Sequence, residues 1–177
     1  MACALTAVSA CSSDDSANAP KASQTVSASE QSKPADPTET AKADAIDTYM
    51  RYWQEMEHVY ATAKVEGTDI KKYAAGPALS RTDVDTKRMH QSGRLFTGGV
   101  TVGNPTVTKT ELGRKVPNVT ISSCLDVSRW KVIDRATKKP VALPTKRLTK
   151  YVTVSTVERW SDGWKVIKDE PQTGQAC

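Results

Sequence analysis

Hydrophobic residues in the first half of the chain recur at helical spacing. One apolar stripe repeats at intervals of three and four and consists of Ile46, Tyr49, Met50, Trp53, Met56, Tyr60 and Ala63. This period predicts a helix that begins near Asp44 and ends at Gly67. Glycine and proline then divide the following segment, which predicts a short helix up to residue 75 and a third helix from Pro77 to His90.

After Arg94 the pattern changes to the alternation that is typical of strands. An extended segment is expected up to Leu112, broken by Gly98, Gly99, Gly103 and Pro105. In the next strand, alternate positions share one face: Val119, Ile121, Ser123, Leu125 and Val127. A long strand follows over 148–159, and Ser161-Asp162-Gly163 between two tryptophans predicts a hairpin into a last strand. Helices followed by strands predict an α+β fold with an antiparallel sheet.

The first 42 residues show neither pattern. Residues 5–10 are small or apolar and precede Cys11, while residues 12–42 are rich in Ser, Ala, Thr and Pro and contain no aromatic residue. Such a segment buries too little apolar surface to fold, so we expect 12–42 to be a disordered tether and 43–177 to be the folded domain. No apolar run approaches the eighteen residues that a membrane-spanning helix needs.

The Val8-Ser9-Ala10-Cys11 segment resembles a bacterial lipobox. This resemblance implies that residues 1–11 are the end of a signal peptide and that Cys11 carries the lipid anchor. The expected location is then the extracytoplasmic face of the cell membrane. A signal peptide also needs a basic segment, and because no Lys or Arg precedes Lys21, we expect that segment upstream of Met1.

The folded part resembles a known superfamily in several short motifs. They are the aromatic helix from Tyr49 to Tyr60, the run Ser123-Cys124-Leu125-Asp126-Val127-Ser128, the Asp-Gly hairpin before Trp164-Lys165-Val166, and the terminal Cys177. Together with the lipobox and tether, they are similar to small actinobacterial lipoproteins with a nuclear-transport-factor-two-like domain, also called SnoaL-like or cystatin-like cone. The resemblance implies helices packed on a curved, cone-shaped sheet with a pocket between them, and it implies no settled activity.

Two cysteines remain after the signal peptide and anchor are set aside. Cys124 and Cys177 form an even pair in a chain expected to be exported, which favours a disulfide bond. The alternative is two free thiols. Redox catalysis is disfavoured because the sequence has no Cys-x-x-Cys motif.

Charge divides the chain into unequal parts. The formal net charge is +5, and because residues 12–42 carry −2, the segment 43–177 carries +7. Eight cations lie within 22 residues and oppose only Asp134: Arg129, Lys131, Arg135, Lys138, Lys139, Lys146, Arg147 and Lys150. We call these eight residues the basic strip. It is a candidate surface for anionic lipid headgroups or wall polymers, and the alternative is a solvated hairpin. An exported chain is not expected to bind nucleic acid.

Few residues are candidates for catalysis or metal binding. By analogy with the enzymes of the superfamily, Asp126, Tyr49, Tyr52 and Tyr60 are the candidate proton-transfer residues, although the tyrosines also fit the spacing of a core stripe. His58 falls beside two glutamates off the apolar stripe, and His90 has no partner at a metal-ligand spacing. We therefore predict no cofactor and no metal.

Three functions are compatible with these observations. The first is a cell-surface lipoprotein whose domain binds or scaffolds without catalysis. The second is a small-molecule enzyme of the SnoaL or ketosteroid-isomerase type, and the third is an electrostatic adaptor to membrane or wall polymer. The pocket distinguishes the first two, because an enzyme needs at least two polar groups that point inward.

Overall fold

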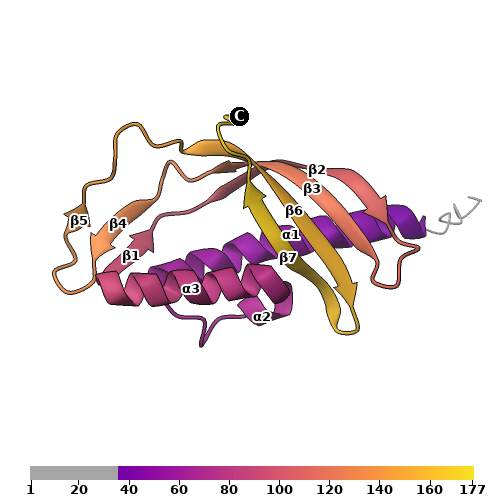
Figure 1. Cartoon of the computed structure of the whole chain (residues 1–177), viewed down its shortest axis with the longest axis horizontal. Helices are drawn as coiled ribbons and strands as arrows, with labels where there is room; N and C mark the ends of the chain where they lie inside the picture. The colour runs from indigo at the N-terminus through magenta and orange to yellow at the C-terminus, as the bar shows by residue number, and fades with distance from the viewer. Residues whose placement is uncertain (1–35) are drawn as a thin grey trace, which may run out of the picture. The chain divides into compact units, whose positions relative to one another are not determined.

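The computed structural model describes residues 36–177, and in this range helices precede strands. The order is α1 (Pro37–Thr62), α2 (Ile70–Tyr73), α3 (Gly76–Ser92), β1 (Arg94–Thr97), β2 (Thr101–Glu111), β3 (Asn118–Asp126), β4 (Lys131–Asp134), β5 (Pro140–Val141), β6 (Lys150–Trp160) and β7 (Gly163–Pro171) (Figure 1). The α+β prediction is confirmed. The Cys11 lipobox and most of the predicted tether lie outside the described residues. No helix within 36–177 is long and apolar enough to cross a membrane.

Helix α1 is longer at its start and shorter at its end than the apolar stripe predicts. Asp36 caps it by accepting a hydrogen bond from the Thr38 amide, and Pro37 occupies the first turn, where its missing N–H costs nothing. The helix therefore begins inside the segment 12–42 that was predicted to be disordered. It ends at Thr62 because Ala63 adopts a left-handed conformation, well before Gly67.

The two shorter helices follow the glycine and proline signals. The second helix is a single turn, and the third begins at Gly76 with proline in its first turn and ends where Gly93 takes a positive φ of 62°. The α3 prediction is confirmed to within two residues at each end. Helix α3 packs against β7 and β1, whereas α1 packs against β1, β7 and β2.

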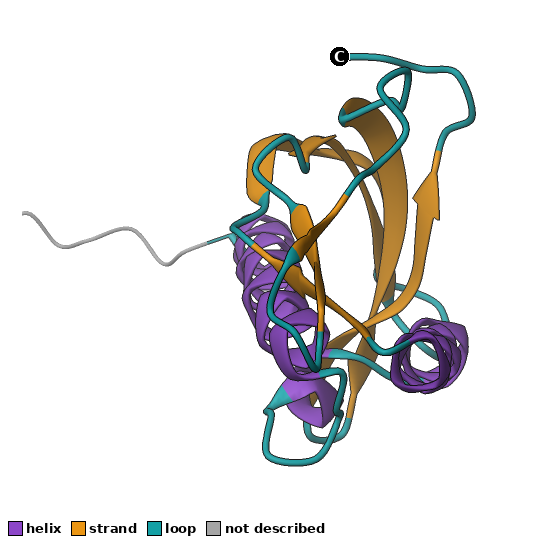
Figure 2. Ribbon diagram, turned by 90° about the vertical axis from the view of Figure 1, so that its left-hand side faces the viewer, coloured by secondary structure: helices purple, strands orange, loops and turns teal. Residues whose placement is uncertain are grey.

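The strands form two antiparallel sheets rather than the one that was expected. The larger sheet has the order β2-β3-β6-β7 and the smaller one the order β1-β4-β5. In Figure 2 the strands curve over the helices, and the core lies between α1 and the inner face of the larger sheet. This arrangement is a cone-like, open α+β fold. The alternation predicted for β3 is confirmed, since Val119, Ile121, Ser123 and Leu125 are all buried.

The extended segment is broken at Gly98 and Gly99, as predicted, but it is not broken at Gly103 and Pro105. Strand β2 runs through both of these residues, with register shifts between Gly103 and Thr106 and between Val107 and Lys109. Because β2 is an edge strand, Pro105 removes no hydrogen bond from a second neighbour, and the bulges absorb its fixed φ.

The disulfide prediction is also confirmed. Cys124 on β3 is bonded to Cys177, with 5.8 Å between the two Cα atoms. The C-terminal segment lies beside β6, where the Gln172 amide donates to the carbonyl of Val152 and the Val152 amide donates to that of Gln175. The bond therefore fastens the last residues to the outer face of the larger sheet.

Candidate functional site

A pocket of about 220 Å³ opens where α1, α3 and β7 meet. Its lining comes from all three elements: Tyr52, Met56 and Tyr60 from α1, Pro77, Ala78, Arg81, Thr82 and Asp85 from α3, and Lys168, Asp169, Glu170 and Pro171 from β7. This is the place at which the resemblance implied a pocket. We call it the polar compartment.

A bulge in β7 decides which side chain of that strand enters the polar compartment. Val157 pairs with Val166 and Thr156 pairs with Lys168, so Ile167 is an extra residue in β7. Beyond the bulge, Asp169 is paired with Ser155 and shares its inward face. Without the extra residue, regular alternation from Val166 would point Lys168 inward instead.

Asp169 is the centre of a small polar cluster in an otherwise apolar interior. Its Oδ1 accepts hydrogen bonds from the Ser155 hydroxyl at 2.5 Å and the Thr153 hydroxyl at 3.2 Å. Desolvation raises the pKa of Asp169 to about 6, although both hydroxyls and the positive charge of Arg81 lower it. Asp169 is half-buried and lines the pocket, so its side chain borders the space that a ligand would occupy.

The three candidate tyrosines have different roles. Tyr49 is fully buried, and its hydroxyl is hydrogen-bonded to Ser123 at 2.8 Å, so it belongs to the core. Tyr52 and Tyr60 line the pocket. The Tyr60 hydroxyl donates to Asp85 at 3.3 Å, whereas that of Tyr52 has no hydrogen-bond partner within residues 36–177. Burial raises the pKa of both pocket tyrosines, so they stay neutral.

A second pocket of about 380 Å³ adjoins the first, since Tyr60 and Asp85 line both. Its other lining residues are Arg88, Met89, Ser92, Arg94, Phe96 and Trp130. The rings of Tyr60, Phe96 and Trp130 form a cluster with centroids 5.4 to 5.8 Å apart, and all three remain partly exposed. We call this the aromatic compartment and the two pockets together the groove.

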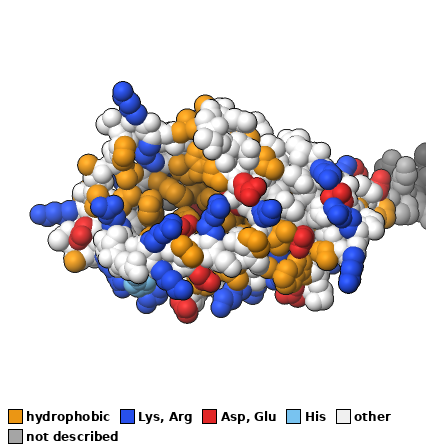
Figure 3. All heavy atoms as spheres, viewed as in Figure 1, with side chains coloured by type: hydrophobic (Ala, Val, Ile, Leu, Met, Phe, Trp, Pro, Cys, Tyr) orange, Lys and Arg blue, Asp and Glu red, His pale blue; other side chains and the backbone are white. Residues whose placement is uncertain are grey.

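Basic side chains surround the groove. In Figure 3 an apolar hollow on this face of the molecule is bordered by several Lys and Arg side chains and few acidic ones. Arg81, Arg94 and Lys168 line the groove without an ion pair to any described residue, and Arg88 has only a 3.8 Å contact with Asp85. The groove thus combines a cluster of aromatic rings, the three acidic residues Asp85, Asp169 and Glu170, and the four basic residues Arg81, Arg88, Arg94 and Lys168.

The remaining single-residue candidates lie outside the groove. Asp126 is on the outer face of β3, where the Ser128 amide and Lys150 contact it and lower its pKa to about 2. His58 is exposed, 3.8 Å from Glu55, and His90 contacts Arg135. Among the described residues, no group of three His, Cys, Asp or Glu side chains is placed to hold a metal ion.

The structure divides the basic strip into two groups. Four members have polar partners: Arg129 donates to Thr101, Arg135 contacts His90, Arg147 donates to the carbonyl of Trp130, and Lys150 pairs with Asp126. The other four are exposed and have no ion pair to a described residue: Lys131, Lys138, Lys139 and Lys146. These four are the part of the strip that is free to meet an anionic surface.

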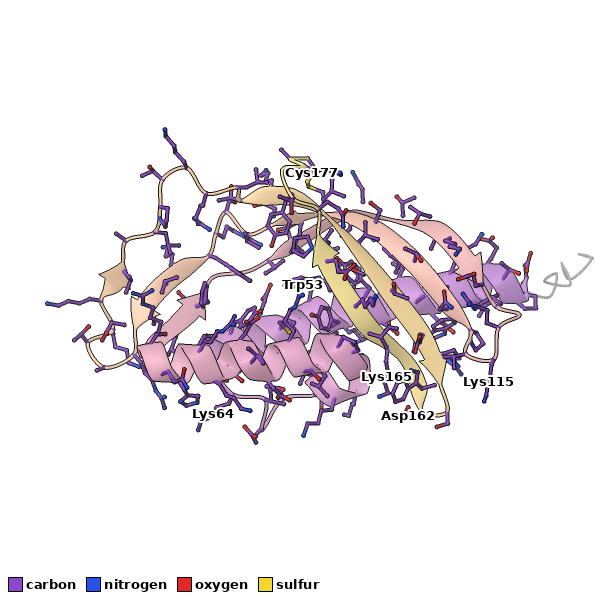
Figure 4. All side chains as sticks on the ribbon, viewed as in Figure 1. Trp53, Lys64, Lys115, Asp162, Lys165 and Cys177 are labelled. Carbon is purple, nitrogen blue, oxygen red and sulfur yellow. A yellow bond between two sulfur atoms is a disulfide. The ribbon has the colours of Figure 1, made fainter. Side chains whose placement is uncertain are left out.

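A buried lysine, Lys165, lies near the start of β7. The Lys165 ammonium donates to the carbonyls of Lys71 and Lys72 at 2.9 and 3.3 Å and pairs with Asp162 at 3.0 Å. Figure 4 shows Lys165 close to Asp162 at the turn between β6 and β7. These contacts join the β6–β7 hairpin to α2.

Sequence reasoning did not find several residues of the groove. Asp169 was missed because the bulge that points it inward leaves no mark in the alternation of apolar residues. Phe96 and Arg94 were missed because they come from a short strand that meets α1 and Trp130 only in three dimensions. No signal in the sequence distinguished Asp169 from the other charged residues of β7, which are Lys165, Lys168 and Glu170.

Comparisons with known proteins give no family. No protein-family model matches the chain, and no curated protein matches it. The structure is similar to a crystal structure of the intermembrane space region of chloroplast protein ARC6, with a TM-score of 0.44, 12% identity, and coverage of 81% of this chain and 100% of that one. It is also similar to a crystal structure of Kfla4162 protein from Kribbella flavida, with a TM-score of 0.42, 15% identity, and coverage of 76% and 90%. These values give no basis for transferring an activity.

Proposed function

We propose that this chain is a lipid-anchored protein of the extracytoplasmic face of the cell membrane whose domain binds a small molecule. The observation that carries the proposal is the groove, in which a cluster of partly exposed aromatic rings lines one pocket, Asp169 lines the other, and Tyr60 and Asp85 line both. Small-molecule sites are typically concave, mainly apolar and provided with a few polar groups.

Two observations support the proposed location. The lipobox-like Val8-Ser9-Ala10-Cys11 precedes a polar segment, as the resemblance to lipoproteins requires. The Cys124–Cys177 bond is of the kind that persists outside the reducing cytoplasm. An anchored chain would keep its groove near the membrane surface.

The lipid anchor has a direct test. We expect a chain expressed with its upstream codons in an actinobacterial host to incorporate an alkyne-labelled fatty acid. Cys11→Ser should abolish the label, whereas the matched change Cys3→Ser should leave it, because residue 3 would leave with the signal peptide. Labelling that survives Cys11→Ser contradicts the anchor.

The binding function is tested with a pocket-filling variant. The full chain carrying Cys3→Ser and Cys11→Ser, produced under oxidising conditions, should bind the apolar dye N-phenyl-1-naphthylamine with a rise in dye fluorescence. Ala78→Phe places a ring in the polar compartment and should weaken binding at least tenfold, whereas Ala61→Phe on the exposed face of α1 should not.

The fold of each variant is checked by circular dichroism. If Ala78→Phe does not fold, Trp130→Ala replaces it, because this change removes one wall of the aromatic compartment. No binding by the parent chain, or equal binding by a folded groove variant, overturns the proposal.

The second candidate is an enzyme that moves protons, and Asp169 favours it. Its raised pKa of about 6 suits a general base, and Tyr52 lines the same pocket. Simple unsaturated ketones incubated with the protein in D2O should then exchange a proton for deuterium, and Asp169→Asn should abolish the exchange. Non-catalytic binding predicts no exchange above that of the variant.

A further inference from the structure

The aromatic compartment favours an anionic ligand, because Arg88 and Arg94 line it and its one acidic lining residue, Asp85, already accepts a hydrogen bond from Tyr60. Asp85 accepts from Tyr60 and lies 3.8 Å from Arg88. Asp169 accepts two hydroxyl hydrogen bonds through Oδ1. Among the described residues, by contrast, Arg81, Arg94 and Lys168 have no ion-pair partner although they line the same groove.

The aromatic compartment provides the apolar surface of the site. Tyr60, Phe96 and Trp130 meet edge to face or tilted, which is a stable arrangement, and yet each ring stays partly exposed. A ligand with a ring or a hydrocarbon chain would cover this surface and remove it from water. Arg88 and Arg94 line the same compartment, so an acidic group on that ligand would meet a guanidinium while its body lies on the rings.

We infer that the groove binds an amphipathic organic anion, with its acidic group held by Arg88 and Arg94 and its apolar body on Tyr60, Phe96 and Trp130. The inference rests on the proposed binding function and adds the chemical class of the ligand. The polar compartment then takes the far end of the body, against Tyr52 and Met56. The positive charge of the domain increases the local concentration of such anions.

The test compares two dyes that share an aryl skeleton and differ in charge. The full chain with Cys3→Ser and Cys11→Ser is titrated with 8-anilinonaphthalene-1-sulfonate, which is anionic, and with neutral N-phenyl-1-naphthylamine. We expect the anionic dye to bind more tightly. Arg88→Gln with Arg94→Gln should weaken the anionic dye about tenfold and change the neutral dye less than twofold.

Further variants and measurements separate the effect of charge at the groove from the effects of charge elsewhere and of unfolding. Arg114→Gln removes an equivalent guanidinium at the β2–β3 turn, where it pairs with Glu111, and should leave both dyes unaffected. Trp130→Ala should weaken both dyes, since it removes part of the shared apolar surface. Thermal unfolding midpoints of all variants show whether each retains the native fold.

Competition between simple amphiphiles identifies the source of the anion. Dodecanoate below its micelle concentration should displace the anionic dye, whereas dodecyltrimethylammonium of equal chain length should not. Displacement only by phosphatidylglycerol vesicles, or stronger displacement by the cationic amphiphile, overturns the inference. Binding of both dyes with no preference for charge overturns the inference but leaves the binding function standing, and binding of neither dye overturns both.

Discussion

At the scale of single residues, Asp169 shows how one inserted position creates a site. The bulge at Ile167 exchanges the lysine that alternation would point inward for a carboxyl group. Ser155 and Thr153 on the neighbouring strand β6 stabilise the carboxyl group at this position, because their hydroxyls donate hydrogen bonds to Oδ1. Burial at this position destabilises the folded state when Asp169 is charged, because the carboxylate is poorly solvated there.

This cost predicts a pH-dependent effect of Asp169→Asn. The folded pKa of about 6 lies above the ordinary 3.8, so the folded state binds the proton more tightly than the unfolded state. The contribution of the Asp169 carboxyl group to the free energy of unfolding is therefore fully present below about pH 4, and it is lost as the pH rises through about 6. Asn, which cannot ionise and still accepts through Oδ1, should raise the free energy of unfolding by up to about 3 kcal/mol at pH 8 and hardly at pH 4.

Urea unfolding at the two pH values measures this difference. Asp44→Asn, which removes an exposed carboxyl group on α1 that does not act on Asp169, is the control and should show no such dependence. A loss of stability in Asp169→Asn at pH 8, or an equal effect at both pH values, would contradict the account of Asp169.

Lys165 leads to a second prediction at this scale. Its buried ammonium group satisfies the carbonyls of Lys71 and Lys72, so Lys165→Met would leave those acceptors facing an apolar group. The free energy of unfolding should fall by about 1–3 kcal/mol. Lys168→Met, on the same strand but exposed, should change it by less than about 0.5 kcal/mol, and equal effects of the two changes in urea unfolding would refute the role of Lys165.

At the scale of elements, the sequence predicted what depends on local periodicity. The apolar stripe of α1, the inward face of β3 and the β6–β7 hairpin each repeat a signal along one segment, and the structure has all three. The start of α1 was placed too late because Pro37–Lys42 owes its helical state to the Asp36 cap rather than to apolar spacing. The aromatic compartment was beyond prediction, since Tyr60, Phe96 and Trp130 meet only through tertiary packing.

The disulfide bond leads to a prediction at the scale of elements. It joins residues 53 positions apart, so in the chain-entropy model it stabilises the fold by about 4 kcal/mol. Cys177→Ser should lower the free energy of unfolding by up to that amount, and reduction of the parent chain should have the same effect. Because the tail contacts β6 and not the groove, dye binding by the folded variant should be unchanged. A stability that is insensitive to both treatments would contradict the prediction.

At the scale of the whole molecule, the domain has two separate basic features. The rim of the groove is built on α3, β1 and β7, whereas the free lysines of the basic strip lie on and around β4 and β5. A groove for a small anion needs cations beside an apolar surface, and an electrostatic adaptor needs cations that project into solvent. The two functions can therefore be separated by mutation.

The last prediction is that the free lysines of the basic strip bind anionic membranes through charge alone. A cation that reaches the headgroups contributes about 1 kcal/mol, and because Lys131, Lys138, Lys139 and Lys146 are exposed, their combined effect is measurable by vesicle sedimentation. The chain with Cys3→Ser and Cys11→Ser should bind phosphatidylglycerol vesicles at 0.1 M salt, should be released at 1 M, where the Debye length falls to about 3 Å, and should not bind phosphatidylcholine.

Replacing the four lysines by Gln should abolish binding, whereas the same change in charge at Lys64, Lys71, Lys87 and Lys115 should reduce it only slightly. Equal losses in the two quadruple variants would mean that net charge, and not the strip, attracts the membrane.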